Sequence, residues 1–136
     1  MGSTRVKILL DTHIWIWSHL DPARINKRLT QALLDPANDL WLSPISLWEC
    51  MVSADKKRLS LKDGPAAWIA TALTSAPMHE APLNNEIALT SRTIKVEHDD
   101  PADKFLAATA AVYDLVLATA DSRLLRGKGF KTLDNR

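Results

Sequence analysis

Cysteine, glycine and long apolar runs are all scarce in this 136-residue chain. Cys50 is the only cysteine, which excludes a disulfide within the chain and makes a reducing cytoplasm the simplest setting. No apolar run approaches the length that a membrane-spanning helix needs, so we expect no membrane contact and no signal peptide. None of the four glycines follows the first apolar run in a glycine-rich turn, which argues against a dinucleotide-binding module.

An excess of charge of either sign is also missing. The 17 basic and 16 acidic residues leave a net charge of +1, which neither favours nor excludes a nucleic-acid partner. The hydrophobic content of 46% and the charged content of 24% are ordinary for a globular protein. Length and composition therefore predict one domain over residues 1–136, with enough chain for a single sizeable core.

Short apolar runs alternate with amphipathic segments along the chain. The runs predict strands at residues 6–11, 39–42, 78–81, 115–119 and 130–133, and the segments between them predict helices. Ser43-Pro44 is a strong helix start, and we expect Ile45, Trp48 and Val52 to form the apolar stripe of that helix. This alternation predicts an α/β fold in which helices cover both faces of a mostly parallel sheet.

Four acidic residues are placed to meet at one edge of that sheet. Asp11 and Asp121 each end an apolar run, and ligands bind outside the carboxyl ends of parallel strands. Glu49 lies in the helix that begins at Pro44, and Asp103 lies in the first turn of a helix that begins after Asp100. Converging carboxylates repel one another unless cations lie between them, so the sequence predicts a Mg²⁺ or Mn²⁺ site.

Such a site suits the hydrolysis of a phosphodiester, because bound cations activate water and stabilise the leaving oxygen. We expect Asp11 and Asp103 to be the inner ligands, with Asp121 and Glu49 completing the set. The supporting hydroxyls expected nearby are those of Thr12 and Ser46. Taken singly, each acid has an ordinary alternative: Asp11 or Asp121 as a helix cap, Asp103 as a partner of its helix dipole, and Glu49 as a half-exposed side chain.

Other polar and aromatic residues carry weaker predictions. The histidines show no zinc-ligand spacing with Cys50, and we expect His98 to lie in a solvated loop. Most of the five tryptophans look like core residues, but Trp15 and Trp17 fall on different faces of one helix, so one of them is a candidate for a partner surface. The clusters at residues 56–58 and 123–131 are either solvated basic surface or phosphate contacts beside the acids.

Four segments of the chain together resemble PIN-domain ribonucleases, specifically the VapC-type toxins of bacterial toxin–antitoxin systems. They are residues 9–13, 43–49, 100–110 and 117–121, and they carry Asp11, Glu49, Asp103 and Asp121 in the family's order. Two features depart from the family's pattern. Lys104 stands where arginine is frequent, and residues 133–136 match the usual ending poorly, which puts the last strand in doubt.

The resemblance implies a three-layer α/β/α sandwich and RNA cleavage that depends on Mg²⁺ or Mn²⁺. It also implies a homodimer and inhibition by a cognate antitoxin protein. Two alternatives stay open beside an endoribonuclease toxin: a metal-dependent phosphatase acting on small phosphoesters, and a non-catalytic PIN-like interaction module. The stretch Asp11-Thr12-His13 lacks the Asp-x-Asp pattern of phosphatases that use an aspartyl nucleophile, and the four acids argue against a degenerate module.

Overall fold

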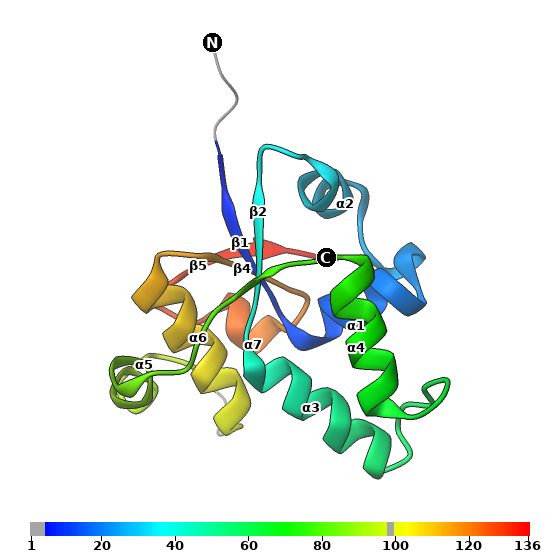
Figure 1. Cartoon of the computed structure of the whole chain (residues 1–136). Coiled ribbons are helices and arrows are strands. Elements are labelled where there is room, and N and C mark those ends of the chain that lie inside the picture. Colours follow the sequence, from blue (N-terminus) through cyan, green and yellow to red (C-terminus); the bar gives the residue numbers. More distant parts are fainter. Residues whose placement is uncertain (1–4, 98–99) are drawn as a thin grey trace.

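The computed structural model describes residues 5–97 and 100–136, so the loop expected at His98 lies outside the described residues. The elements, in chain order, are β1 (Lys7–Leu10), α1 (Thr12–Leu20), the 3₁₀ helix η1 (Pro22–Arg24), α2 (Lys27–Leu34), β2 (Asp39–Leu42), α3 (Pro44–Asp55), α4 (Pro65–Ser75), β3 (His79–Glu80), α5 (Asn85–Thr90), α6 (Pro101–Tyr113), β4 (Val116–Thr119), α7 (Ser122–Leu125) and β5 (Lys131–Asp134) (Figure 1). Strands and helices alternate much as the apolar runs predict.

All the strand pairs of the five-stranded sheet are parallel, in the order β3-β2-β1-β4-β5. The first strand, β1, lies in the centre, where Leu9 pairs with Trp41 of β2 and Leu10 pairs with Ala118 of β4. The last strand, β5, pairs in parallel with β4, so the strand that the poorly matching tail put in doubt is present. The carboxyl ends of β1 and β4 therefore lie side by side.

Helices cover both faces of the sheet, as the predicted three-layer α/β/α arrangement requires. Because side chains alternate across a strand, Ile8 and Leu10 of β1 enter one core while Leu9 enters the other. The first core is closed by α1, α2, α3 and α4, and the second is closed mainly by α6. Figure 1 shows α5 and α6 on one side of the sheet, with α1, α2 and α4 on the other.

Serine and aspartate caps begin the two helices that carry Glu49 and Asp103. Ser43 accepts a hydrogen bond from the backbone N–H of Ile45 at 3.1 Å, and Pro44 follows it in the first turn of α3. The Asp100 side chain likewise accepts a hydrogen bond of 3.0 Å from the backbone N–H of Ala102, at the start of α6. These local starts place both acids within the first two turns of their helices, toward the carboxyl ends of the strands.

The apolar stripe expected on α3 is wrong. Trp48 is 57% exposed, and the residues of α3 that are fully buried are Ser46 and Cys50. The helix packs against α1 and α4 through this less apolar face, because the Ser46 hydroxyl finds a buried hydrogen-bonding partner on α1 in Thr12. None of the described helices is both long and apolar enough to cross a membrane.

Candidate active site

Asp11 lies where β1 gives way to α1, and its side chain is turned away from the helix start. It occupies the N-cap position of α1 but makes no capping hydrogen bond, so the ordinary capping role does not explain it. Its Oδ2 atom instead accepts a hydrogen bond of 2.6 Å from the Thr119 hydroxyl at the end of β4. The residue is only 6% exposed, which places a carboxylate almost wholly inside the protein.

Two hydroxyls connect the start of α1 to α3. The Thr12 hydroxyl hydrogen-bonds to Glu49 Oε1 at 2.5 Å and to the Ser46 hydroxyl at 2.8 Å. Both Thr12 and Ser46 are buried, and Glu49 is half-buried between α3 and the sheet end. Thr12 therefore holds the Glu49 carboxylate at the same end of the sheet as Asp11, and Ser46 contacts Thr12 in turn.

Asp103 enters the same region from α6. It lies in the first turn of that helix and is 7% exposed. Its charge acts on both Asp11 and Glu49, since it raises the pKa of each of their carboxyls. Asp11, Glu49 and Asp103 thus come from three different elements and influence one another electrostatically.

Burial and mutual repulsion make this cluster costly to ionise fully. Burial raises the pKa of Asp11 to about 6, and the Asp103 carboxylate adds to the rise, although the Thr119 hydrogen bond and the charge of His13 oppose it. Burial also raises the pKa of Glu49 to about 7, and the charges of Asp11, Asp103 and Asp100 act in the same direction against the Thr12 hydrogen bond. A nearby cation would relieve both effects.

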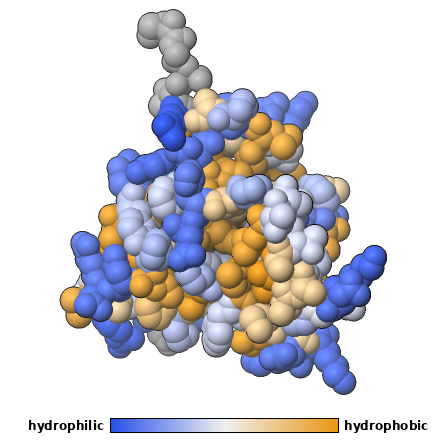
Figure 2. Space-filling model, viewed as in Figure 1, coloured by the Kyte–Doolittle hydropathy of each residue, from blue (hydrophilic) through white to orange (hydrophobic). Residues whose placement is uncertain are grey.

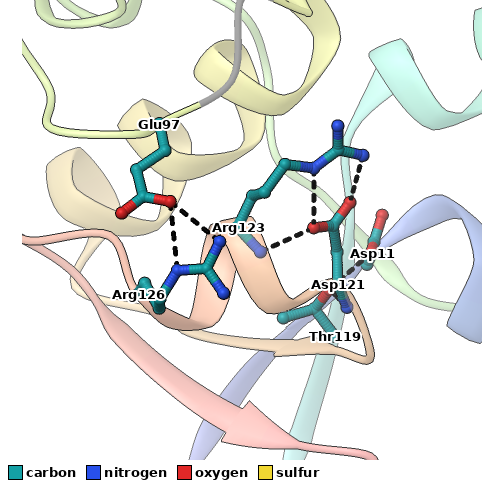
Figure 3. A network of polar contacts seen from close by, with 6 residues as sticks. All are labelled: Asp11, Glu97, Thr119, Asp121, Arg123 and Arg126. Carbon is teal, nitrogen blue, oxygen red and sulfur yellow. Dashed lines mark hydrogen bonds and ion pairs between the residues drawn. The ribbon is translucent and has the colours of Figure 1, made fainter.

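Asp121 follows β4, the neighbour of β1 in the sheet, and its carboxylate contacts Arg123 (Figure 3). It caps α7 by accepting a hydrogen bond of 2.8 Å from the backbone N–H of Arg123, and the Arg123 guanidinium contacts its carboxylate at 3.4 Å. Burial acts to raise the pKa of Asp121, but the hydrogen bonds and charge of Arg123 outweigh it and lower the pKa. The capping alternative therefore holds for Asp121, which lies beside the cluster with its charge already compensated.

The chemistry of the donors fits a hard divalent cation. Asp11, Glu49 and Asp103 offer only carboxylate oxygens, which Mg²⁺ and Mn²⁺ prefer, and the raised pKa values of Asp11 and Glu49 show that the negative charge of these two residues is poorly compensated by the protein. Among residues 5–97 and 100–136, no group of three or more His, Cys, Asp or Glu side chains is already arranged to hold an ion.

No sequence motif indicates a role for Thr119, and Arg123 stands out in the sequence only as part of a basic cluster. Thr119 donates to Asp11 across 108 residues of chain, and Arg123 neutralises Asp121. The signal for Thr119 was its place at the end of a parallel strand, one residue past Ala118, the partner of Leu10. Arg126, from the same basic cluster, instead pairs with Glu97 at 2.8 Å (Figure 3), so that pair makes it less available to a phosphate.

An apolar cavity lies apart from the acids. It measures about 370 Å³ and is lined by residues of β2, α3, α4 and β3, namely Leu42, Ser43, Pro44, Leu47, Leu73, Pro77, Met78, His79 and Glu80. Figure 2 shows apolar side chains gathered over this part of the molecule. None of Asp11, Glu49, Asp103 and Asp121 lines this cavity.

Comparison with known sequences gives a consistent match over most of the chain. The model of the family described as "PIN domain" matches residues 8–129. A protein named Ribonuclease VapC22, from Mycobacterium tuberculosis, is 27% identical over 118 residues, which are 86% of this chain and 88% of that protein.

Solved structures of low sequence identity share the fold. VapBC2 from Rickettsia felis, bound to a promoter DNA fragment, contains a chain with a TM-score of 0.71 and 14% identity, covering 95% of this chain and 98% of that one. A chain of DNA-bound VapBC from Salmonella typhimurium has a TM-score of 0.68 and 20% identity, covering 95% of this chain and 98% of that one. A toxin–antitoxin complex from Klebsiella pneumoniae gives 0.63 at 22% identity, with the same coverage. At these identities the likeness is one of fold.

Proposed function

Since the chain belongs to the PIN domain family, we propose that it is a metal-dependent endoribonuclease that hydrolyses RNA phosphodiesters in the cytoplasm as the toxin of a toxin–antitoxin pair. Residues 1–136 would form a single PIN-like domain. The proposal is supported by the relative named Ribonuclease VapC22 and by the solved neighbours named as VapBC or toxin–antitoxin complexes.

The single observation that carries the proposal is the crowding of three carboxylates at the end of a parallel sheet. Asp11 and Asp103 are nearly inaccessible, Glu49 is half-buried, and the pKa values of Asp11 and Glu49 are raised to about 6 and about 7. Apolar side chains at these positions would make the folded state more stable than buried acids do. Retaining acids at such a cost is typical of a site that works with a cation.

Each residue of the cluster has a part in the proposed site. Asp11 and Asp103 would be the inner ligands of Mg²⁺ or Mn²⁺, and Glu49 would bind directly or through water, held in place by Thr12 and Ser46. When bound, the cation supplies the positive charge that attracts the phosphate and lowers the pKa of a water molecule. The Thr119 hydroxyl orients the Asp11 carboxylate by occupying one of its oxygens.

Asp121 would be the fourth acid of the site. In the described arrangement it pairs with Arg123, whose side chain is 46% exposed at the edge of the cluster. Arginine is well suited to phosphate because its planar fork can donate two parallel hydrogen bonds. We propose that an RNA phosphate competes for Arg123 and thereby releases Asp121 toward the site.

The test is cleavage of a pool of structured RNAs with Mg²⁺ or Mn²⁺, compared with EDTA. We expect discrete fragments from the wild-type protein in metal, and none in EDTA or from Asp103→Asn, because the amide removes a charge that the cation needs. Asp114→Asn is the matched control, since Asp114 is the exposed residue that ends the same helix and its left-handed backbone suits asparagine. It should cleave like the wild type.

The outcomes separate the proposal from its alternatives. Undiminished cleavage by folded Asp103→Asn would contradict the assignment of the site. Hydrolysis of p-nitrophenyl phosphate without any RNA cleavage would favour a small-phosphoester phosphatase. A folded wild-type protein that neither binds Mn²⁺ nor acts on either substrate would favour a non-catalytic interaction module.

A cognate antitoxin and a second copy of the chain are the proposed protein partners. The apolar cavity beside β3 offers a docking place for an apolar segment of the antitoxin, away from the acids. Trp48 and Met51, which are 57% and 43% exposed on α3, offer an apolar contact for a second copy. Binding and association are tested separately from cleavage, because neither needs an active site.

A further inference from the structure

Three side chains lie against one another on the surface of α1 and the turn that follows it, and this group is called the stack below. The ring centroids of His13 and Trp17 lie 5.8 Å apart with the two rings tilted by 42°, and the Arg24 guanidinium carbon lies 4.0 Å from the centroid of the Trp17 ring. His13 and Trp17 are four residues apart, so they fall on the same face of the helix. His13 and Arg24 are exposed, and Trp17 is partly so.

The stack begins at the proposed active site. His13 is two residues beyond Asp11, and its charge is close enough to lower the pKa of that carboxyl against the effect of burial. From there the stack runs along α1 through Trp17 to Arg24 in η1. An RNA strand whose phosphate reached Asp11 would therefore have its neighbouring nucleotide within reach of these rings.

The backbone that carries Arg24 is tied down by the C-terminal segment. The side chain of Asn135, which is 8% exposed, donates to the Arg24 carbonyl at 3.0 Å and accepts from the Asn26 N–H at 2.7 Å. The backbone N–H of Asn135 donates to the carbonyl of Thr119, whose hydroxyl holds Asp11. The stack and the acids are thus supported by the same strand end.

The stack has the chemistry of a base-binding platform. Unpaired bases stack on aromatic rings and on guanidinium planes, and each such contact tolerates different bases. In the described ranges Arg24 makes no ion pair, so its charge is available to a phosphate. Trp17 packs one side against the core, which fixes the ring in place.

We propose that His13, Trp17 and Arg24 form a subsite that stacks an unpaired base of the RNA substrate beside the cleaved phosphate. The inference rests on the proposed ribonuclease function and adds a preference for single-stranded RNA at the nucleotide next to the cut. A paired base presents no free face to the stack, so a duplex is excluded from it. Trp17 and Arg24 act in binding and specificity, while the acids act on the phosphodiester.

The experiment measures RNA binding and cleavage separately. A fluorescein-labelled short single-stranded RNA and the same strand in a duplex are titrated into Asp103→Asn protein, which binds without cutting. Trp17→Leu keeps the apolar bulk against the core and removes the π face, Trp17→Phe restores an aromatic face, and Arg24→Gln removes the charge. Arg28→Gln, an exposed arginine on α2, is the matched control.

We expect Trp17→Leu and Arg24→Gln to weaken binding of the single strand by about tenfold, with Trp17→Phe restoring most of it and Arg28→Gln without effect. Duplex binding should be weaker and should respond little to Trp17→Leu. In the active protein the same variants should raise KM more than they lower kcat. If the three side chains only stabilised the turn, the variants would lower the melting temperature without changing KM relative to kcat or single-strand binding relative to duplex binding.

Failure of this proposal is distinct from failure of the proposed function. If the wild type cleaves RNA and folded Trp17→Leu and Arg24→Gln bind and cleave like it, the subsite is wrong and the ribonuclease assignment stands. If the wild type cleaves no RNA, the ribonuclease assignment fails. Unchanged single-strand binding by both variants would then overturn the subsite as well, whereas tenfold weaker binding would support it as an RNA-binding site.

Discussion

At the scale of single residues, the buried carboxyls of Asp11 and Glu49 are the groups whose ionisation lowers the stability of the fold. Their carboxyls are removed from water and face other acids, so each holds its proton to a higher pH in the folded chain than in the unfolded one. The folded pKa of Asp11 is about 6 against an ordinary 3.8, and that of Glu49 is about 7 against 4.5. Folding and ionisation of these two groups therefore oppose each other when no cation is present.

This opposition predicts an unusual pH dependence of stability in EDTA. Between the unfolded and folded pKa values the folded protein binds more protons, so the free energy of unfolding falls as the pH rises. For Asp11 the stability is fully present below about pH 4 and is lost as the pH passes about 6. We expect a loss on the order of 2 kcal/mol between pH 5 and 7.5, measured by urea denaturation.

Two comparisons identify the source of that loss. Glu49→Gln cannot ionise, so its stability should fall less steeply over the same pH interval. Added Mn²⁺ should restore stability to the wild type at pH 7.5, because a ligand that binds the folded state stabilises it. Wild-type and Glu49→Gln profiles that rise together from pH 5 to 7.5 in EDTA would contradict this account.

At the scale of elements, the last strand and the residue after it connect the sheet to a distant turn, and we expect this link to stabilise the fold. β5 adds to the sheet beside β4, and the following Asn135 joins it to the turn between η1 and α2. The side chain of Asn26 caps α2 and donates to the carbonyl of Asp134 at 3.1 Å. The C-terminal segment and the turn before α2 are thus linked through the side-chain amides of Asn135 and Asn26.

We expect Asn135→Ala to lower the free energy of unfolding by about 2 kcal/mol, because the Asn26 N–H and the Arg24 carbonyl would lose their partners away from water. Chemical denaturation measures the change. Asn85→Ala, at an exposed position on α5, is the control and should stay within about 0.5 kcal/mol of the wild type. A change at Asn135 no larger than that of the control would show that the link has little energetic weight.

At the scale of the whole molecule, α3 presents an apolar face that the fold leaves uncovered. Trp48 and Met51 lie three residues apart on one face of the helix, and both are exposed large side chains. Tryptophan and methionine are enriched where proteins associate, while isolated exposed apolar residues elsewhere are common. The pair suits the proposed contact between two copies of the chain.

We expect Trp48→Lys to shift the protein from dimer to monomer, because a charge would be buried in the contact. Sedimentation velocity at several protein concentrations gives the association constant. Leu34→Lys is the matched control, since Leu34 is 77% exposed on α2 and should not affect association. A wild-type protein that stays monomeric at all concentrations would contradict the proposed homodimer, and a dimer unaffected by Trp48→Lys would place the contact elsewhere.

The sequence by itself determined the features that depend on neighbouring residues. Ser43-Pro44 and Asp100-Pro101 begin α3 and α6 as predicted, because caps and prolines act within one helical turn. The acids Asp11 and Asp121 follow buried strands, and the alternation of strands and helices was enough to predict an α/β fold with a parallel sheet.

Only the tertiary structure decided what depends on partners far along the chain. The buried face of α3 is the one with Ser46, against an expected stripe containing Trp48, because Thr12 supplies a partner 34 residues away. Asp11 is held by Thr119 across 108 residues, and the Arg24 carbonyl is held by Asn135 across 111. Local patterns place a residue on an element, but the energy of a buried polar group depends on which side chain the fold brings against it.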